Sequence, residues 1–200
     1  MMNLRKFLAV FFLGALVLTS CSDDDDNPDP GTEEEVITTM TVTLTDGTDP
    51  VVLNFFDADG ENGPIDPVPT VTGVFKANTT YEGTILLLNT TEDPTEIVNE
   101  EIEAEADEHQ FFYLTEDLGI TIAYDDMESD YVNSEGVAFT SENPVGIDFT
   151  LTTSNDTGNG QLRIVLRHEL SKDAAGVSDG DITNAGGSPD IDWTFNISVE

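Results

Sequence analysis

The chain has 200 residues, and its 41 Asp and Glu residues outnumber its 6 Lys and Arg residues, which gives a formal net charge of −35. Such a charge excludes nucleic acid as a partner, because binding to phosphates requires Lys and Arg side chains. It favours solubility and the attraction of cations, and the length is sufficient for one domain with a substantial core.

The first residues have the pattern of a bacterial export signal. Arg5 and Lys6 are followed by an uncharged apolar run, residues 7–18. This run has the length of a signal-peptide core and is shorter than the roughly 20 residues that span a bilayer. Residues 18–21, Leu-Thr-Ser-Cys, resemble the lipobox of bacterial lipoproteins. The resemblance implies that Cys21 receives a diacylglycerol and becomes the N-terminus after cleavage.

Cleavage before Cys21 divides the chain into a signal peptide, residues 1–20, and a mature protein. Residues 21–35 carry many like charges and little to bury, so we expect an acidic, disordered tether before a single domain at residues 36–200. The acidic run 23–26 resembles the export signal of surface lipoproteins in Bacteroidota. We therefore expect a lipid-anchored outer-membrane protein on the cell surface, with the periplasmic face as the alternative.

After the tether, apolar and polar residues alternate with a period of two, which is typical of half-buried strands. Residues 36–56 predict a hairpin, because two such runs flank an Asp-Gly-Thr-Asp-Pro turn. Two more hairpins are expected, formed by residues 109–114 with 120–124 and by residues 147–151 with 162–166. Further strands are expected at residues 70–76, 81–89, 97–106, 137–140 and 191–199.

Residues 97–106 place acidic side chains opposite Ile102, Ala104 and Ala106. Like charges on one face of a strand repel one another, so we expect an exposed edge strand here. A helix is the alternative, because Glu and Ala are good helix formers.

The pattern as a whole predicts an all-β protein of nine or ten short strands. Regular turn signals and the lack of a convincing amphipathic helix favour an antiparallel β-sandwich, Greek key or immunoglobulin-like. A closed β-barrel is the alternative.

Several strings outside the signal resemble a family of uncharacterised Bacteroidota lipoproteins. They are residues 33–39, 77–81, 105–112 (Glu-Ala-Asp-Glu-His-Gln-Phe-Phe), 166–169 (Leu-Arg-His-Glu) and 180–187 (Gly-Asp-Ile-Thr-Asn-Ala-Gly-Gly). The resemblance covers nearly the whole mature chain, and it implies no established activity or catalytic residue.

An acidic, glycine-containing loop resembles part of a calcium site. Asp57, Asp59 and Glu61 alternate in a segment that turns tightly, and Ca²⁺ prefers several oxygen ligands from one short segment. The match to an EF-hand loop is imperfect, because Asn62 stands where glycine is expected. A solvated acidic turn is the alternative. Weaker acidic clusters lie at residues 125–130 and 179–192.

The only two histidines are a second candidate for metal binding. His109 and His168 both have acidic neighbours, including Glu169, and imidazole with carboxylate is a ligand set for Zn²⁺. His168 extends the inward row of its strand, and His109 shares parity with Phe111. The two imidazoles would therefore converge if both strands end at the same rim. Two unrelated, hydrogen-bonded histidines are the alternative.

Three of the few basic residues, Arg163, Arg167 and Lys172, lie close together in the sequence and form a candidate patch for an anion or an acidic partner. The alternative is internal pairing with the acids of residues 101–105.

The sequence has no phosphate-binding Gly-Lys loop, and its single cysteine is assigned to the anchor, so we nominate no catalytic nucleophile. We expect a non-enzymatic lipoprotein that acts as a binding or receptor-accessory module. Ca²⁺ or Zn²⁺ is the candidate ligand, and an outer-membrane transporter is a candidate partner. A structural or adhesive surface protein without a small ligand is the alternative.

Overall fold

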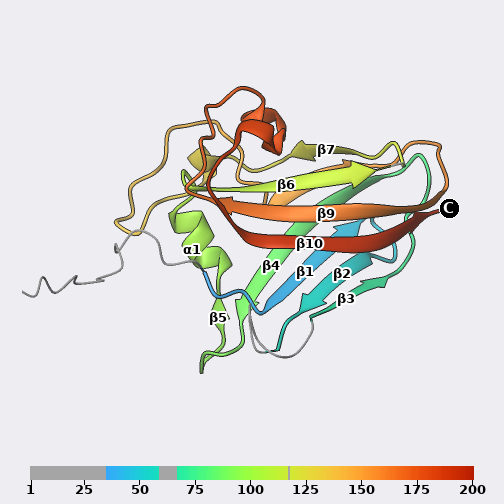
Figure 1. The fold of residues 1–200 in the computed structure, drawn as a ribbon, viewed down its shortest axis with the longest axis horizontal. Coiled ribbons are helices and arrows are strands. Elements are labelled where there is room, and N and C mark those ends of the chain that lie inside the picture. The colour runs from blue at the N-terminus through green and yellow to red at the C-terminus, as the bar shows by residue number, and fades with distance from the viewer. Residues whose placement is uncertain (1–34, 59–66, 117) are drawn as a thin grey trace, which may run out of the picture. The chain divides into compact units, whose positions relative to one another are not determined.

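Two antiparallel sheets form the fold in the computed structural model, which describes residues 35–58, 67–116 and 118–200 (Figure 1). The larger sheet has the order β3-β2-β1-β4-β8-β7, with β5 beside β4, and the smaller has the order β10-β9-β6. The larger sheet contains β1 (Thr39–Thr45), β2 (Val51–Phe56), β3 (Val68–Thr72), β4 (Thr80–Asn89), β5 (Glu96–Ile97), β7 (Thr121–Tyr124) and β8 (Asp148–Thr152). The smaller sheet contains β6 (His109–Glu116), β9 (Gly158–His168) and β10 (Ser188–Val199).

The strand order confirms the expected Greek-key sandwich. Strands β1, β2 and β3 pair in succession, and β4 returns to lie antiparallel beside β1, which is the Greek-key order. The two sheets do not close on each other, so the barrel alternative is wrong. All described residues belong to one compact unit, Glu34–Glu200, which contains the whole core.

The core lies between the two sheets and follows from the alternation in the sequence. In β1 every second residue (Met40, Val42 and Leu44) is fully buried, and threonines occupy the other face. Burying each such side chain is worth about 1.5–3 kcal/mol. Phe55 of β2 stacks on Trp193 of β10, with ring centroids 3.6 Å apart, and this pair joins the two sheets.

The smaller sheet is covered on its outer face as well. Phe112 of β6 and Val165 of β9 point away from the main core and pack with Leu170, Val177 and Ala185. These partners belong to the loop that carries two short 3₁₀ helices, η2 (Val177–Asp179) and η3 (Ile182–Asn184). Because both faces of β6 are buried, its first five residues are all buried and its sequence shows little alternation.

The hairpin of residues 36–56 is confirmed as β1 and β2, but the other two expected hairpins are wrong. Strand β6 pairs with β9, while β7 pairs with β8 in the other sheet. Strand β8 pairs with β4 and β7, and β9 pairs with β6 and β10. Both turns therefore carry the chain from one sheet to the other, which alternation alone cannot reveal.

The expected strand at residues 97–106 is also wrong, and the helical alternative is confirmed. After β5, residues Asn99–Ala104 form helix α1. Val98, Ile102 and Ala106 are spaced by four and are all buried, which is the period of a helix. The side chain of Asn99 fastens the helix to β4, because it accepts from Leu87 N–H at 2.7 Å and donates to the Ile85 carbonyl at 3.0 Å.

Two smaller points complete the fold. Residues 137–140 form no strand and contribute only one bridge, between Val132 and Ala138. Among the described residues, no helix has the length and hydrophobicity needed to cross a membrane.

Candidate metal centre

The two histidines meet at one end of the smaller sheet, because β6 and β9 meet the condition of a shared rim. The register of β6 and β9 places His109 directly opposite His168. Opposed residues of neighbouring strands hold their Cβ atoms about 4.5–5.5 Å apart. The two imidazole rings accordingly stack, with centroids 4.4 Å apart and an angle of 19° between their planes.

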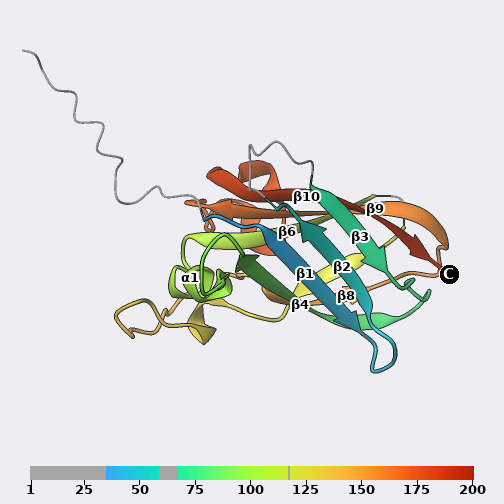
Figure 2. The ribbon, with the colours of Figure 1, turned by 90° about the horizontal axis from the view of Figure 1, so that it is seen from below.

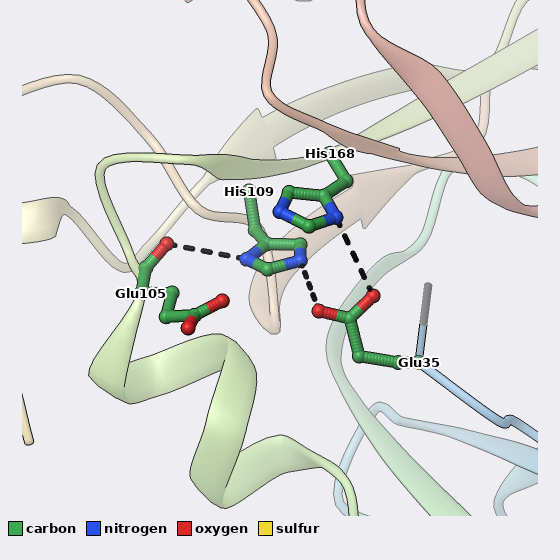
Figure 3. A group of neighbouring side chains, drawn as sticks. All are labelled: Glu35, Glu105, His109 and His168. Atoms are coloured by element: carbon green, nitrogen blue, oxygen red, sulfur yellow. Dashed lines mark hydrogen bonds and ion pairs between the residues drawn. The ribbon is translucent and has the colours of Figure 1, made fainter. Parts of the chain in front are cut away.

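Two glutamates from other parts of the chain complete the cluster (Figure 3). Glu35 lies in the segment that leads into β1, and Glu105 follows α1. Glu35 Oε1 is 2.9 Å from His109 Nε2, and Glu35 Oε2 is 3.7 Å from His168 Nδ1. One ligand atom from each of Glu35, Glu105, His109 and His168 lies within 4.8 Å of all the others.

The protonation of His109 is constrained by its second ring nitrogen. His109 Nδ1 lies 3.2 Å from the backbone oxygen of Glu105, and this oxygen can only accept a hydrogen bond. Nδ1 therefore carries a proton, and in the neutral ring Nε2 presents a lone pair. A histidine that donates one N–H to a backbone carbonyl while its other nitrogen faces a carboxylate has the arrangement of a metal ligand.

His109 Nε2 faces a carboxylate inside the protein. The imidazole of His109 is fully buried, and the side chain of Glu35 is 2% exposed. Neither His109 Nε2 nor Glu35 Oε2 has a hydrogen bond of acceptable geometry, although Nε2 is only 2.9 Å from Oε1. Two facing acceptors are unfavourable unless a proton or a cation lies between them.

In the absence of a cation, Glu35 and His109 stabilise each other's charged forms. Burial acts to raise the pKa of Glu35, but the 2.9 Å contact with His109 and the charge of that ring outweigh it, so that this pKa lies below its usual value. Burial acts to lower the pKa of His109, but contact with Glu35 outweighs it and raises this pKa. Burial raises the pKa of Glu105, and the charge of nearby Glu35 adds to this effect.

His168 also belongs to a second, more exposed group. Its Nε2 lies 3.5 Å from Glu108 Oε2, and Glu108, His168 and Glu169 offer ligand atoms within 4.8 Å of one another. The predicted site residue Glu169 therefore lies beside His168, but outside the buried cluster. Asp190 borders the buried cluster, with its Oδ2 3.9 Å from His109 Nε2.

The predicted calcium loop remains untested. Asp57 is buried, and its N–H donates to the Thr38 carbonyl at 2.8 Å. Asp59 and Glu61 lie outside the described residues, and so does the lipidation candidate Cys21.

The structure does not bring the three predicted cations together at one site. Arg163 makes a bidentate contact with Asp192 at 2.6 and 2.5 Å. Arg167 donates to the carbonyl of Gly187 at 3.1 Å, and Lys172 Nζ lies 3.1 Å from Glu128 Oε1. Each contacts another group of this chain: an acid for Arg163 and Lys172, and a backbone carbonyl for Arg167. None of these contacts is with the acids of residues 101–105, so the alternative expected the wrong partners.

The acidic cluster at residues 125–130 has a structural role in the described part of the chain. The carboxylate of Asp126 accepts from the N–H groups of Gly146 and Ile147 at 2.8 and 3.0 Å and from the Tyr131 hydroxyl at 2.7 Å. Burial raises the pKa of Asp126. Three donors satisfy this carboxylate, and Glu128 faces Lys172 instead of its acidic neighbours.

Sequence reasoning overlooked one motif of catalytic type. Residues 176–180, Gly-Val-Ser-Asp-Gly, match the Gly-x-Ser-x-Gly pattern of serine hydrolases, which functions on a sharp turn between a strand and a helix. Here Ser178 lies exposed in η2, in the loop that covers the outer face of the smaller sheet. The histidines lie at the inner face, so the motif match does not form a catalytic elbow.

The fold and the cluster together define a class of protein: an antiparallel β-sandwich with a buried pair of histidines and a pair of glutamates at the end of one sheet. No protein-family model matches the chain, and no curated protein or solved structure matches it significantly. The resemblance to uncharacterised Bacteroidota lipoproteins therefore stays a prediction from its motifs.

Proposed function

We propose that this chain is a non-enzymatic, lipid-anchored protein of the bacterial envelope whose sandwich domain binds a divalent transition metal, with Zn²⁺ as the best-suited ion. The observation that carries the metal proposal is the buried His109 Nε2, which lies 2.9 Å from the Glu35 carboxylate without a hydrogen bond of acceptable geometry. The anchor proposal is supported by the basic and apolar start of the chain and by Cys21 after residues 18–20.

Zinc fits the cluster in ligand type, charge and spacing. Zn²⁺ takes imidazole nitrogens and carboxylate oxygens at about 2.0–2.2 Å, which places tetrahedral ligands roughly 3.3 Å apart. The Glu35 contacts of 2.9 and 3.7 Å lie on either side of this value, and a carboxylate oxygen of Glu105 lies within 4.8 Å of the other ligand atoms. With both imidazoles neutral, the set carries two negative charges, which a divalent ion neutralises.

Four protein ligands correspond to a structural rather than a catalytic zinc site, because a catalytic site keeps one position for water or substrate. Ca²⁺ is less suited to this cluster, since it prefers six to eight oxygen ligands. A structural or adhesive protein without a small ligand is the alternative, and the ion pair between Glu35 and protonated His109 favours it.

Zinc titration tests the proposal. A soluble chain that begins at Ser22 retains every described residue, and calorimetry is expected to show one Zn²⁺ bound per chain. At a free concentration of 100 times the dissociation constant, zinc should add about 2.7 kcal/mol to the free energy of unfolding. Glu35→Gln should lower the affinity at least tenfold, because it removes the charge and one oxygen ligand.

The control is Glu108→Gln, which alters only the exposed group around His168. It should leave zinc affinity within about twofold, and Ca²⁺ should produce no comparable stabilisation. Failure to bind micromolar zinc, or equal losses in both variants, would reject the buried site.

The pH dependence separates the metal-bound from the metal-free state. Because the pKa of His109 is raised above 6.5, its pairing contributes fully below that pH and is lost as the pH rises through the raised value. Because the pKa of Glu35 is lowered below 4.5, its contribution is lost as the pH falls through the lowered value. The metal-free pair is therefore most stabilising between pH 4.5 and 6.5.

The stabilisation by zinc should increase as the pH rises above 6.5, whereas the stabilisation by the metal-free pair decreases. The reason is that protons compete with the metal for His109. Thermal unfolding is measured with EDTA and with zinc, and the difference in stability between the two should grow from pH 6 to pH 8. This growth corresponds to an increase of about an order of magnitude in the apparent affinity for zinc. A zinc effect that stays constant over this range would contradict histidine ligation.

A further inference from the structure

A row of side chains that are apolar except for Thr39 crosses the outer face of the larger sheet. The register places Val68, Phe56, Thr39, Leu88 and Ile97 side by side on β3, β2, β1, β4 and β5. Leu86 lies on the same face of β4, two residues from Leu88. We call these six residues the apolar row. With neighbouring strands about 4.8 Å apart, it is roughly 19 Å long.

The apolar row is open to solvent. Four of its members, Val68, Phe56, Leu86 and Ile97, are between 43% and 56% exposed. Figure 2 shows β1, β2, β3 and β4 from the side that points away from the smaller sheet, with β6 behind them and α1 beside them. Thr39 and Leu88, between these members, are half-buried. Scattered exposed apolar residues need no explanation, whereas several grouped on one sheet face beside a polar rim are a mark of an interaction surface.

The rim beside β5 is acidic. A surface hollow of about 640 Å³ lies between β5 and α1, lined by Ile97 of the row together with Glu96, Glu100, Glu101 and Glu105. Burial raises the pKa of Glu101, and the charges of Glu35, Glu105 and Glu96 raise it further. The acids of this rim therefore repel one another, and a positive group placed here would be attracted.

The cations of the chain's described part do not supply that charge. Lys76 pairs with Asp46 at 2.6 Å, Arg163 with Asp192, and Lys172 with Glu128. Arg167 donates to a backbone carbonyl near the start of β10. Each Lys and Arg between residues 35 and 200 is therefore engaged elsewhere, and a partner molecule is the source of complementary charge that we consider.

We propose that the apolar row docks a segment of a partner protein in which apolar side chains are flanked by Lys or Arg. A second copy of this chain is a poor occupant, since it brings the same excess of acids, with a net charge of −35. Anionic lipid is disfavoured for the same reason. The partner binds to the sheet face and not to the edge, because Pro67 and Pro69 remove backbone donors at β3.

A model peptide tests this surface. The probe is a fluorescent 14-residue peptide of Leu and Lys with its leucines on one helical face, compared with a scrambled peptide of the same composition. Anisotropy with the chain from Ser22 should show at least tenfold tighter binding of the amphipathic peptide. Phe56→Ser and Ile97→Ser should each weaken it at least fivefold without changing the net charge.

The matched control is Val74→Ser, because Val74 is exposed to 41% and Ile97 to 45%, and Val74 lies outside the row. It should leave binding within twofold. Equal binding of the two peptides, or equal effects of Val74→Ser and Ile97→Ser, would overturn the proposal. Flotation with zwitterionic vesicles, or a dimer in sedimentation, that Ile97→Ser abolishes would also overturn it, in favour of a membrane or a second copy.

Discussion

A Gly187→Ala variant is expected to lose at least about 4 kcal/mol of unfolding free energy, which is exceptional for a single methyl group. Gly187 has φ of +66°, and a Cβ atom there would lie 2.1 Å from the carbonyl oxygen of His168. It would also lie 3.1 Å from the backbone nitrogen of Leu170. These neighbours are backbone atoms next to the β9 and β10 ladder, so they cannot rotate away as a side chain can.

The neighbouring glycine separates steric overlap from backbone strain. Gly186 has φ of +67°, but a Cβ atom there would meet nothing within 4 Å. Gly186→Ala should therefore cost only the left-handed conformation, about 1–2 kcal/mol. Urea unfolding of both variants measures the difference, and equal losses would show that the overlap with His168 is relieved at no cost.

The same variant reports on the metal centre. Relief of the overlap at Gly187 requires movement of the His168 backbone, and His168 supplies one of the four proposed ligands. Where Gly187→Ala is still folded, its zinc affinity should fall further than that of Gly186→Ala. The contact between Gly187 and the carbonyl group of His168 thus couples the turn before β10 to the position of a proposed ligand.

The architecture was predictable because the alternation of apolar and polar residues indicates which side chains are buried. The period of two in β1 and β10 identified strands, and their inward rows form the observed core. Partner choice was not predictable in the same way. The turn between β8 and β9 has the composition of a hairpin turn, yet it crosses from one sheet to the other. Composition describes a turn locally, whereas pairing depends on the packing of the whole sandwich.

Half of the candidate site could be derived from the sequence. The parity of His109 and His168 within their strands predicts convergence if both strands end at the same rim, and the register shows that they do. The sequence pattern places Glu35 in the acidic tether, because it follows two other glutamates and no periodic pattern includes it. Glu105 was expected on the wet face of a strand, and only the helix before it turns its carboxylate toward His109.

Lys172→Met is expected to lower the free energy of unfolding by about 3–5 kcal/mol, because it leaves a buried carboxylate without its cation. Lys172 Nζ lies 3.1 Å from Glu128 Oε1, and both side chains are only 4% exposed. The ammonium also donates to the carbonyl of Ala106. Burial lowers the pKa of Lys172 despite the opposing charge of Glu128, which shows how costly this environment is for a charge.

The double variant Lys172→Met/Glu128→Leu should recover most of this loss. Two apolar side chains of similar volume bury no charge, and such replacements of buried pairs are often neutral or stabilising. The remaining cost is the unsatisfied carbonyl of Ala106, about 1–3 kcal/mol. Urea unfolding of the single and double variants forms a cycle that isolates the coupling. If the double variant is no more stable than Lys172→Met, the loss comes from the contact with Ala106 and not from the stranded charge of Glu128.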